Sequence, residues 1–309
     1  MLKIGVQSSR WYDKNDPLES LKFIKECGFE AIDFNIDTEI SIKKLAESGI
    51  YPTIFDKSIE ELRDYYAPLK QALEATGVVI SQMHAPFPTL FEGNDELNEY
   101  INLVLDKCFA VCEYLGCPAI VVHPLVSTAS RSEQLNANIE YYKTLIPLIK
   151  KYKGVKICSE NIFTRFNGRV VGGRFSVVDD TCILIDTLNS EAGGDYFGFC
   201  LDIGHAILTK SNINEYIKTL GHRLTVLHIH DNNGLEDQHL IPYSCISTGS
   251  GTVCDWEGFI DGLKSIGYDG ALSFETFRSF KILPKSVMPS ALRMIAAIGR
   301  EWINQLTAE

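Results

Sequence analysis

Apolar residues follow two different periods along this chain. Short runs rich in Val, Ile and Phe have the length and composition of buried strands, and segments with apolar residues three and four positions apart follow them. This pattern predicts a strand followed by helix, eight times over. The predicted strands are 2–7, 31–36, 78–84, 119–123, 155–160, 197–202, 224–227 and 271–275, and the predicted helices are 18–28, 42–48, 59–76, 96–115, 132–152, 180–188, 213–220, 256–266 and 285–305.

Strands that alternate with helices imply parallel strands joined by right-handed crossovers. Eight such units in 309 residues predict an α/β fold, a closed (β/α)₈ TIM barrel that forms one domain over 1–309. An open, doubly wound sheet is the alternative. Such a sheet often has a glycine-rich phosphate turn after its first strand, and SSRWYDKND stands there instead.

Polar residues cluster at the carboxyl ends of the predicted strands. In a TIM barrel these ends form one face, on which the catalytic residues gather. Six consecutive strands end in an acid or a histidine, and packing alone does not explain six, because a buried carboxylate is costly unless it is paired or metal-bound. The residues are His84, His123, Glu160, Asp202, His205, His228, His230, Asp231 and Glu275, followed by Asp237 and His239 in the loop after the seventh strand.

The densest part of this pattern is the stretch LHIHDNNGLEDQHLIP at 227–242. It holds three of the seven histidines, with acids between them. A lone histidine is more often a packing residue. Three histidines with interspersed carboxylates are the usual ligands of divalent ions such as Zn and Mn, so the stretch predicts a metal site.

Composition narrows the choice of partners. The net charge of −11 argues against a broad nucleic-acid surface, and no apolar run approaches the length of a membrane span. The first residues lack the apolar region and cleavage site of a secretory signal. Nine cysteines form no CxxC pair, which is typical of reduced packing residues, and a cytoplasmic location is therefore expected.

Seven short motifs, HAPF, VVHP, SENI, CLDIGH, HIHD, DQH and SFET, occur in this order along the chain. Together they resemble the xylose isomerase-like TIM barrel superfamily, which includes sugar phosphate isomerases and epimerases and endonuclease IV-like proteins. The likeness runs over essentially the whole chain. By position it implies one divalent metal (Mn, Mg, Co or Zn) held by Glu160, Asp202, His228 and Glu275. His228 is chosen by the H-x-x-D pattern, and His230 stands where the family often has lysine.

The endonuclease IV branch uses nine ligands for three zinc ions, and this chain has all nine types. The segment DQHLIP is more similar to the sugar-isomerase version of the seventh loop. YSCISTGSGTVCD, which follows it, is longer than the family's usual turn, so the substrate stays open. The nine are His84, His123, Glu160, Asp202, His205, His228, Asp237, His239 and Glu275.

The resemblance implies a metal-dependent sugar or sugar phosphate isomerase or epimerase, with a small carbohydrate as partner. Glu160 and Glu275 would exchange protons with carbon through an enediolate. His205 and His239 would orient hydroxyls or hold further metal, with His84, His123, His230 and Asp237 available for the same tasks. The alternatives are a dehydratase or lyase acting on a keto-sugar, inosose or keto-glycoside, an endonuclease for abasic DNA, and a non-catalytic binding role. A homo-oligomer is compatible with the sequence. Three aromatic residues just beyond strand ends, Trp11, Phe87 and Phe163, could form a wall against a sugar ring.

Overall fold

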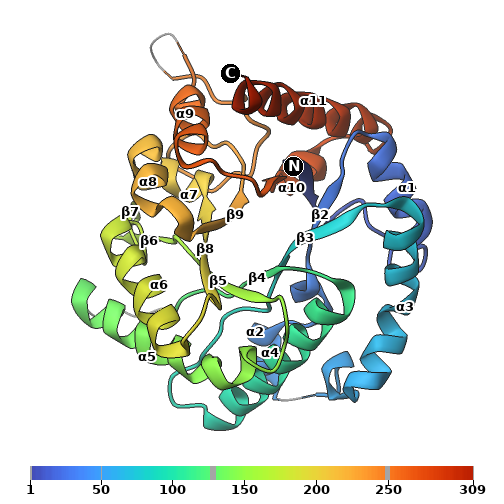
Figure 1. Ribbon diagram of the computed structural model, residues 1–309, viewed down its shortest axis with the longest axis vertical. Helices are drawn as coiled ribbons and strands as arrows, with labels where there is room; N and C mark the ends of the chain where they lie inside the picture. Colours follow the sequence, from blue (N-terminus) through green and yellow to red (C-terminus); the bar gives the residue numbers. More distant parts are fainter. Residues whose placement is uncertain (1, 50, 126–129, 248–250, 309) are drawn as a thin grey trace.

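Eight parallel strands form a barrel in the computed structural model, which describes residues 2–49, 51–125, 130–247 and 251–308 (Figure 1). Their order around the barrel is β10-β1-β2-β3-β4-β5-β8-β9. The barrel closes between β9 and β10, where Ile229 pairs with Phe274 in a parallel bridge. The strands are β1 (Lys3–Gln7), β2 (Ala31–Phe34), β3 (Val79–His84), β4 (Ala119–Val121), β5 (Lys156–Glu160), β8 (Phe197–Asp202), β9 (Leu224–His228) and β10 (Ala271–Phe274).

Helices surround the barrel in Figure 1. The α-helices are α1 (Pro17–Glu26), α2 (Ile42–Ser48), α3 (Ile59–Thr76), α4 (Asp95–Leu115), α5 (Arg131–Ile149), α6 (Val178–Ala192), α7 (Ile203–Leu208), α8 (Ile213–Leu220), α9 (Trp256–Ile266), α10 (Phe277–Ile282) and α11 (Met288–Thr307). Four 3₁₀ turns accompany them, η1 (Ile36–Glu39), η2 (Ile54–Asp56), η3 (Gly221–Arg223) and η4 (Lys285–Val287).

Local sequence explains where the long helices start and stop. Ser58 and Glu61 form a reciprocal capping box at the start of α3, and the helix ends at Gly77, whose φ of 73° is open to glycine at little cost. At the start of α4 the side chain of Asn94 accepts from the backbone N–H of Leu97, and Gly116 ends that helix. These signals set the ends of two of the helices that form the crossovers between neighbouring parallel strands.

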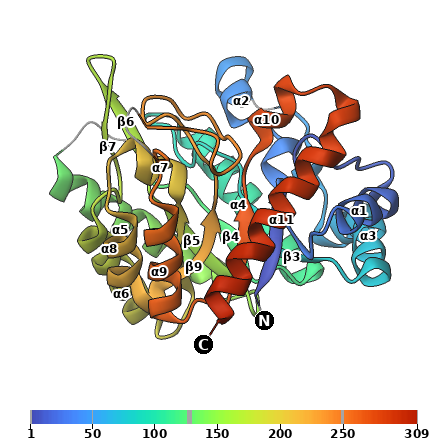
Figure 2. The same cartoon turned by 90° about the horizontal axis from the view of Figure 1, so that it is seen from above.

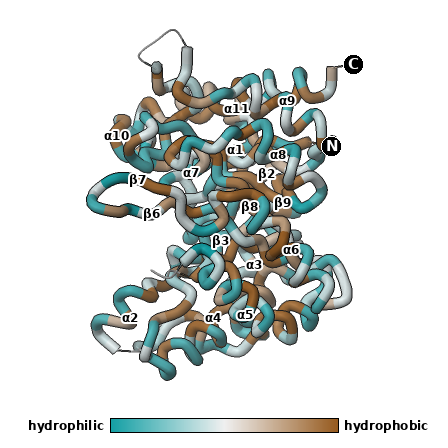
Figure 3. Tube along the Cα trace, turned by 90° about the vertical axis from the view of Figure 1, so that its left-hand side faces the viewer, coloured by the Kyte–Doolittle hydropathy of each residue, from teal (hydrophilic) through white to brown (hydrophobic). Residues whose placement is uncertain are grey.

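The apolar residues form two packed regions. The larger one lies between the strands and the helices, and the hydropathy colouring of Figure 3 shows its apolar strand segments at the centre of the molecule. The smaller one lies among the strands themselves and consists of short side chains, because eight strands leave a narrow interior. Its members are Ala119, Val121, Cys158, Cys200 and Val226.

The predicted barrel is confirmed, and most predicted elements differ from the observed ones by a few residues at their ends. Three segments differ more. An antiparallel hairpin, β6 (Phe163–Phe166) and β7 (Arg169–Gly172), occupies part of the long loop after β5. The short helices α7 and α10 follow directly after strands, and they are too short to leave a periodic apolar pattern in the sequence.

The two ends of the barrel differ in their cover. Figure 2 shows the hairpin, α7 and α10 on the side of the strand C-termini, with both chain termini toward the other side. No helix in the described part of the chain is long and apolar enough to cross a membrane. All nine cysteines are free thiols in the structure, and eight of them are buried.

Candidate metal centre

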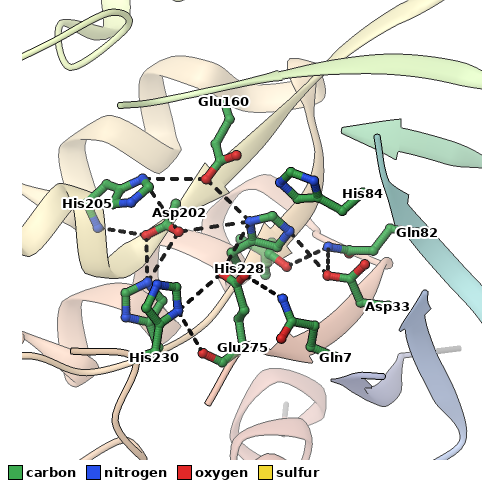
Figure 4. A network of polar contacts seen from close by, with 12 residues as sticks. Gln7, Asp33, Gln82, His84, Glu160, Asp202, His205, His228, His230 and Glu275 are labelled. Atoms are coloured by element: carbon green, nitrogen blue, oxygen red, sulfur yellow. Dashed lines mark hydrogen bonds and ion pairs between the residues drawn. The ribbon is translucent and has the colours of Figure 1, made fainter. Parts of the chain in front are cut away.

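Figure 4 shows His84, Glu160, Asp202, His205, His228, His230 and Glu275 at the mouth formed by the strand C-termini. With His123, Asp237 and His239 these are the ten predicted site residues, and all ten gather there. Nine of them line one cavity of about 290 Å³. The tenth, His230, is fully buried and stacks on the ring of His239 with centroids 4.0 Å apart. The nine that line the cavity are His84, His123, Glu160, Asp202, His205, His228, Asp237, His239 and Glu275.

Nδ1 of His228 is at the centre of the four residues that the sequence motifs single out. It lies 3.4 Å from Oε1 of Glu160, 3.6 Å from Oε2 of Glu275 and 3.9 Å from Oδ2 of Asp202. All four side chains are buried. Three carboxylates that converge on one imidazole nitrogen are a donor set suited to a divalent ion.

A second layer of polar residues holds these side chains in place. Nε2 of His228 lies 3.2 Å from Oδ2 of Asp33, and the amide of Gln82 donates to the same carboxylate at 3.3 Å. On the other side, Gln7 donates to Oε1 of Glu275 at 2.6 Å. Sequence reasoning missed Gln7, Asp33 and Gln82. The available signal was a polar residue within each of three strands that are otherwise largely apolar.

The histidines around the centre share one hydrogen-bonding arrangement. Nδ1 of His84 donates to the carbonyl of Ala85 at 2.9 Å, and Nδ1 of His205 donates to the carbonyl of Asn161 at 2.8 Å. His239 does the same toward the carbonyl of Glu275 at 3.1 Å. A ligating histidine usually donates one ring N–H to a neighbouring acceptor in this way. That hydrogen bond fixes the tautomer and leaves the lone pair of Nε2 available to bind a metal.

Two flanking clusters lie beside the centre. On one side, Nε2 of His123 is 3.1 Å from both Nε2 of His84 and Oε2 of Glu160. On the other side, Oδ2 of Asp237 lies 3.0 Å from Nε2 of His239, and Oδ1 of Asp237 lies 4.0 Å from Nε2 of His205. In the first cluster, His84, His123 and Glu160 offer ligand atoms that all lie within 4.8 Å of one another.

His230 supports Asp202 from behind. Its Nε2 is 3.1 Å from Oδ1 of Asp202, and Oδ1 of the same carboxylate also accepts from the backbone N–H of His205 at 2.6 Å. The histidine at this position therefore holds Asp202 in place and does not line the cavity.

The buried groups of the centre fit a bound cation. Within the described residues, Oε2 of Glu160 and Oδ1 of Asp237 are buried and have no hydrogen-bond partner in suitable geometry. Orphaned carboxylate oxygens are costly unless a cation compensates them. These oxygens, together with the Nε2 atoms of the three histidines, form a set of ligand atoms that fits a divalent ion. Burial alone would lower the pKa of His205, but Asp202 and Glu160 raise it to about 10, so a metal bound there would displace a proton.

The local environment also sets protonation. Burial, with the nearby His123, lowers the pKa of His84 to about 3, so this imidazole is neutral, as a ligand must be. Burial alone would raise the pKa of Glu160, but the His228 and His123 imidazoles hold it well below its usual range. Burial raises the pKa of Glu275. The two glutamates thus occupy electrostatically different positions.

Aromatic side chains form part of the cavity wall. Phe87 lines the cavity and stacks on His123 at 4.5 Å. Phe163 was also expected in this wall, but it packs behind His205 at 5.2 Å and does not line the cavity. Trp11 was expected in this wall, but it is buried and donates its indole N–H to the carbonyl of Gln7. Phe277, at the start of α10, lines the cavity instead and packs 4.5 Å from His239.

Gly204 is required by the packing of His230, and this can be tested. An added Cβ at Gly204 would lie 1.8 Å from Cε1 of His230. We expect Gly204→Ala to lower the free energy of unfolding by about 1–3 kcal/mol, measured by urea denaturation, because the imidazole has no room to move. Gly5→Ala is the matched control, since a Cβ there meets its neighbours at 3.5 Å or more. Equal stability of the two variants would contradict this account.

A profile of the xylose isomerase-like TIM barrel family matches residues 21–303. The chain belongs to that family. Among curated proteins, the chain is 31% identical over 232 residues to the uncharacterized protein MJ1311 of Methanocaldococcus jannaschii, covering 71% of this chain and 68% of that protein. It is 26% identical over 287 residues to the uncharacterized protein y4fM of Sinorhizobium fredii, covering 90% of this chain and 86% of that protein.

Solved structures share the fold of this family member. The 3-keto-D-glucoside 4-epimerase YcjR from E. coli superposes with a TM-score of 0.68 at 16% identity, covering 97% of this chain and 100% of that one. D-psicose 3-epimerase from Clostridium cellulolyticum H10 superposes with a TM-score of 0.67 at 13% identity, covering 98% and 99%. At these identities the likeness establishes the barrel architecture.

Proposed function

We propose that this protein is a metal-dependent sugar isomerase or epimerase. The observation that carries the proposal is the placement of two buried glutamates, Glu160 and Glu275, against Nδ1 of His228 at 3.4 and 3.6 Å. Both glutamates line the same cavity. Membership of the xylose isomerase-like family and a barrel shared with two sugar epimerases support this reading.

Glu160, Asp202, His228 and Glu275 would hold one divalent ion, with Mn, Mg, Co and Zn all compatible with mixed oxygen and nitrogen donors. Such an ion would polarise a sugar carbonyl and stabilise the negative charge that develops on proton loss. Glu160 comes from β5 and Glu275 from the end of β10, so they approach the substrate from different sides. One glutamate would remove a proton from carbon and keep it, and the other, protonated beforehand, would deliver its own proton to the opposite face or to the adjacent carbon.

The remaining cavity residues position the substrate. His205 and His239 have their Nδ1 atoms tied to backbone carbonyls, so each presents Nε2 to the cavity side near Asp237. These nitrogens would bind sugar hydroxyls. The same machinery permits elimination if a histidine protonates a leaving hydroxyl, which is the dehydratase or lyase reading. The product, either an isomeric sugar or a dehydrated one, distinguishes the two.

Cleavage of abasic DNA is the second candidate, and the two flanking clusters favour it. His84 and His123, with Glu160, offer ligand atoms within 4.8 Å of one another, and Asp237 lies 3.0 Å from His239, so each cluster would supply a further metal site. The net charge of −11 opposes it, because a DNA-binding surface needs compensating cations.

One set of assays tests this ranking. We expect the metal-loaded protein to contain one tightly bound divalent ion per chain by elemental analysis. In deuterated water, a panel of ketoses and keto-glycosides would be incubated with the protein. At least one of them should exchange hydrogen for deuterium at the carbon next to its carbonyl group. It should leave an abasic DNA duplex intact at physiological salt.

The same assays identify the competing function. Three zinc ions per chain together with cleavage of the abasic duplex would reverse the ranking, and that cleavage should fall steeply with added salt. Protein stripped by a chelator and then reloaded is the control for metal dependence. Deuterium exchange that survives complete metal removal would contradict the proposed mechanism.

A further inference from the structure

We call the cavity of about 290 Å³ at the metal centre the catalytic cavity, and two more cavities flank it along the β1–β2 side of the barrel mouth. Next to it lies a cavity of about 580 Å³, which shares Gln7, Asn35, Asp37 and Phe277 with the catalytic cavity. A third cavity of about 260 Å³ shares Tyr12, Lys14, Phe34 and Glu39 with the second. We call the second and third cavities together the extension groove.

The size of the groove exceeds what a single sugar ring needs. The catalytic cavity, at about 290 Å³, is at the lower end of the range of about 300–1,000 Å³ for small-molecule sites. The extension groove alone offers more volume than the catalytic cavity. A substrate that fills both would carry a second group attached to the reacting ring.

The junction between the two spaces is built for hydrogen bonding. Asn35 is fixed there, because its Oδ1 accepts from the backbone N–H of Ser9 at 3.3 Å and its Nδ2 donates to Oδ1 of Asp37 at 3.2 Å. The hydrogen bond from Asn35 engages Oδ1 of Asp37 and not Oδ2. Burial raises the pKa of Asp37 to about 7, so its carboxyl can accept or donate a bond to a hydroxyl near neutral pH.

The wall of the groove combines aromatic rings with polar groups. Tyr12 packs edge-to-face on Phe34 with centroids 5.6 Å apart, and both residues line the two outer cavities. At the far end, the hydroxyl of Tyr65 lies 3.4 Å from Glu39. Apolar ring surfaces with a few fixed polar groups are the usual lining of a small-molecule site, and they suit the C–H faces and hydroxyls of a sugar.

The charges in the groove favour a neutral ligand over a phosphorylated one. Lys14 is already paired with Glu39 at 3.2 Å. Among the described residues that line the groove, Arg10 is the one cation without an ion-pair or hydrogen-bond partner, and two carboxyl groups, Asp37 and Glu39, line the same space. The φ of 82° at Arg10 is unusual for a residue with a side chain, and such backbone strain is common at binding sites.

We propose that the extension groove binds the second ring of a glycoside or disaccharide whose reacting ring sits at the metal centre. This inference rests on the proposed sugar chemistry and specifies its substrate class. Gln7 links the two spaces, because it lines both and donates to Glu275 (Figure 4). The groove then selects substrates by the group attached to the reacting sugar.

Binding measurements test the groove without turnover. Saturation-transfer NMR and calorimetry with the Mg²⁺-loaded protein would compare lactulose, cellobiose and maltose with fructose and glucose. We expect at least one disaccharide to bind about tenfold more tightly than its monosaccharide, with saturation reaching both rings. Thr38 is exposed and lines the groove, so Thr38→Trp should fill it and lower the ratio of disaccharide to monosaccharide affinity about tenfold.

Thr219→Trp, at an exposed position on α8 outside the groove, is the matched control and should leave that ratio unchanged. Two results would overturn the groove proposal and leave the proposed sugar function standing. One is that monosaccharides bind as tightly as every disaccharide, and the other is that Thr38→Trp leaves the ratio of disaccharide to monosaccharide affinity unchanged. Tighter binding of fructose 6-phosphate that Thr38→Trp abolishes would assign the groove to an anion and also overturn it. If no sugar binds, the proposed carbohydrate function fails together with the groove.

Discussion

Replacing Glu160 or Glu275 by glutamine is expected to lower turnover of a ketose substrate by about 10²–10⁴-fold, the usual effect of losing a positioned general base. Glutamine keeps the size and one oxygen that can contact the ion but cannot exchange a proton with carbon. Metal binding should weaken yet recover at excess metal, because Asp202 and His228 remain in place. Turnover would be measured at saturating metal, so that chemistry is separated from occupancy.

Isotope exchange would assign the two roles. A variant that lacks only the returning acid should still exchange solvent deuterium on one face of the sugar while forming no epimer. Glu236→Gln is the matched control, because Glu236 is an exposed acid near the site, in the loop after β9, and does not line the catalytic cavity. If both active-site variants keep near wild-type turnover with metal bound, the proton belongs to a histidine such as His205 or His239, and the elimination reading moves ahead.

Replacing Asp202 by alanine is expected to abolish stoichiometric metal binding, because this side chain supplies one of three carboxylates around His228. Elemental analysis after dialysis would measure it. Asp202 also accepts the backbone N–H of His205 and so caps α7. A cap lost in this way costs about 0.5–2 kcal/mol of unfolding free energy, so the variant should stay folded with slightly lower stability.

Asp255→Ala separates these two effects. Asp255 caps α9 by accepting from the backbone N–H of Gly258 at 2.8 Å, and it lies outside the catalytic cavity. We expect Asp255→Ala to lose comparable stability and keep its metal. Full metal content in the Asp202 variant would show that the four-residue assignment is wrong and that a flanking cluster, such as His84 with His123, holds the ion.

The barrel and most of the site could be predicted from the sequence, because parallel strands joined by helices have their carboxyl ends on one face. An acid or histidine at such an end, such as Glu160 or His228, therefore has a predictable location before any side-chain contact is known. Several carboxylates buried at one face also need a compensating positive charge, and this predicts a metal ion there.

Other features depended on contacts between residues far apart in the chain. Gln7 and Glu275, which hydrogen-bond at 2.6 Å, are 268 positions apart, and they meet because β1 pairs with β10 as the barrel closes. The support of His228 by Asp33 and of Asp202 by His230 has the same origin. The local sequence shows each of these residues only as a polar residue in a strand or loop, so it does not predict the partner.

The extension groove depended on tertiary structure even more strongly. Its walls come from the loop after β1, from η1 and from α3, and no periodic pattern in the sequence marks a space between three elements. The hydrophobic periodicity of a segment indicates which face of that one element is buried. A cavity forms where several elements do not fill the volume between them, so the sequence of one element does not predict it. The sequence therefore determined which face of the barrel carries the candidate metal centre, and the packing of the loops decided the space available beside it.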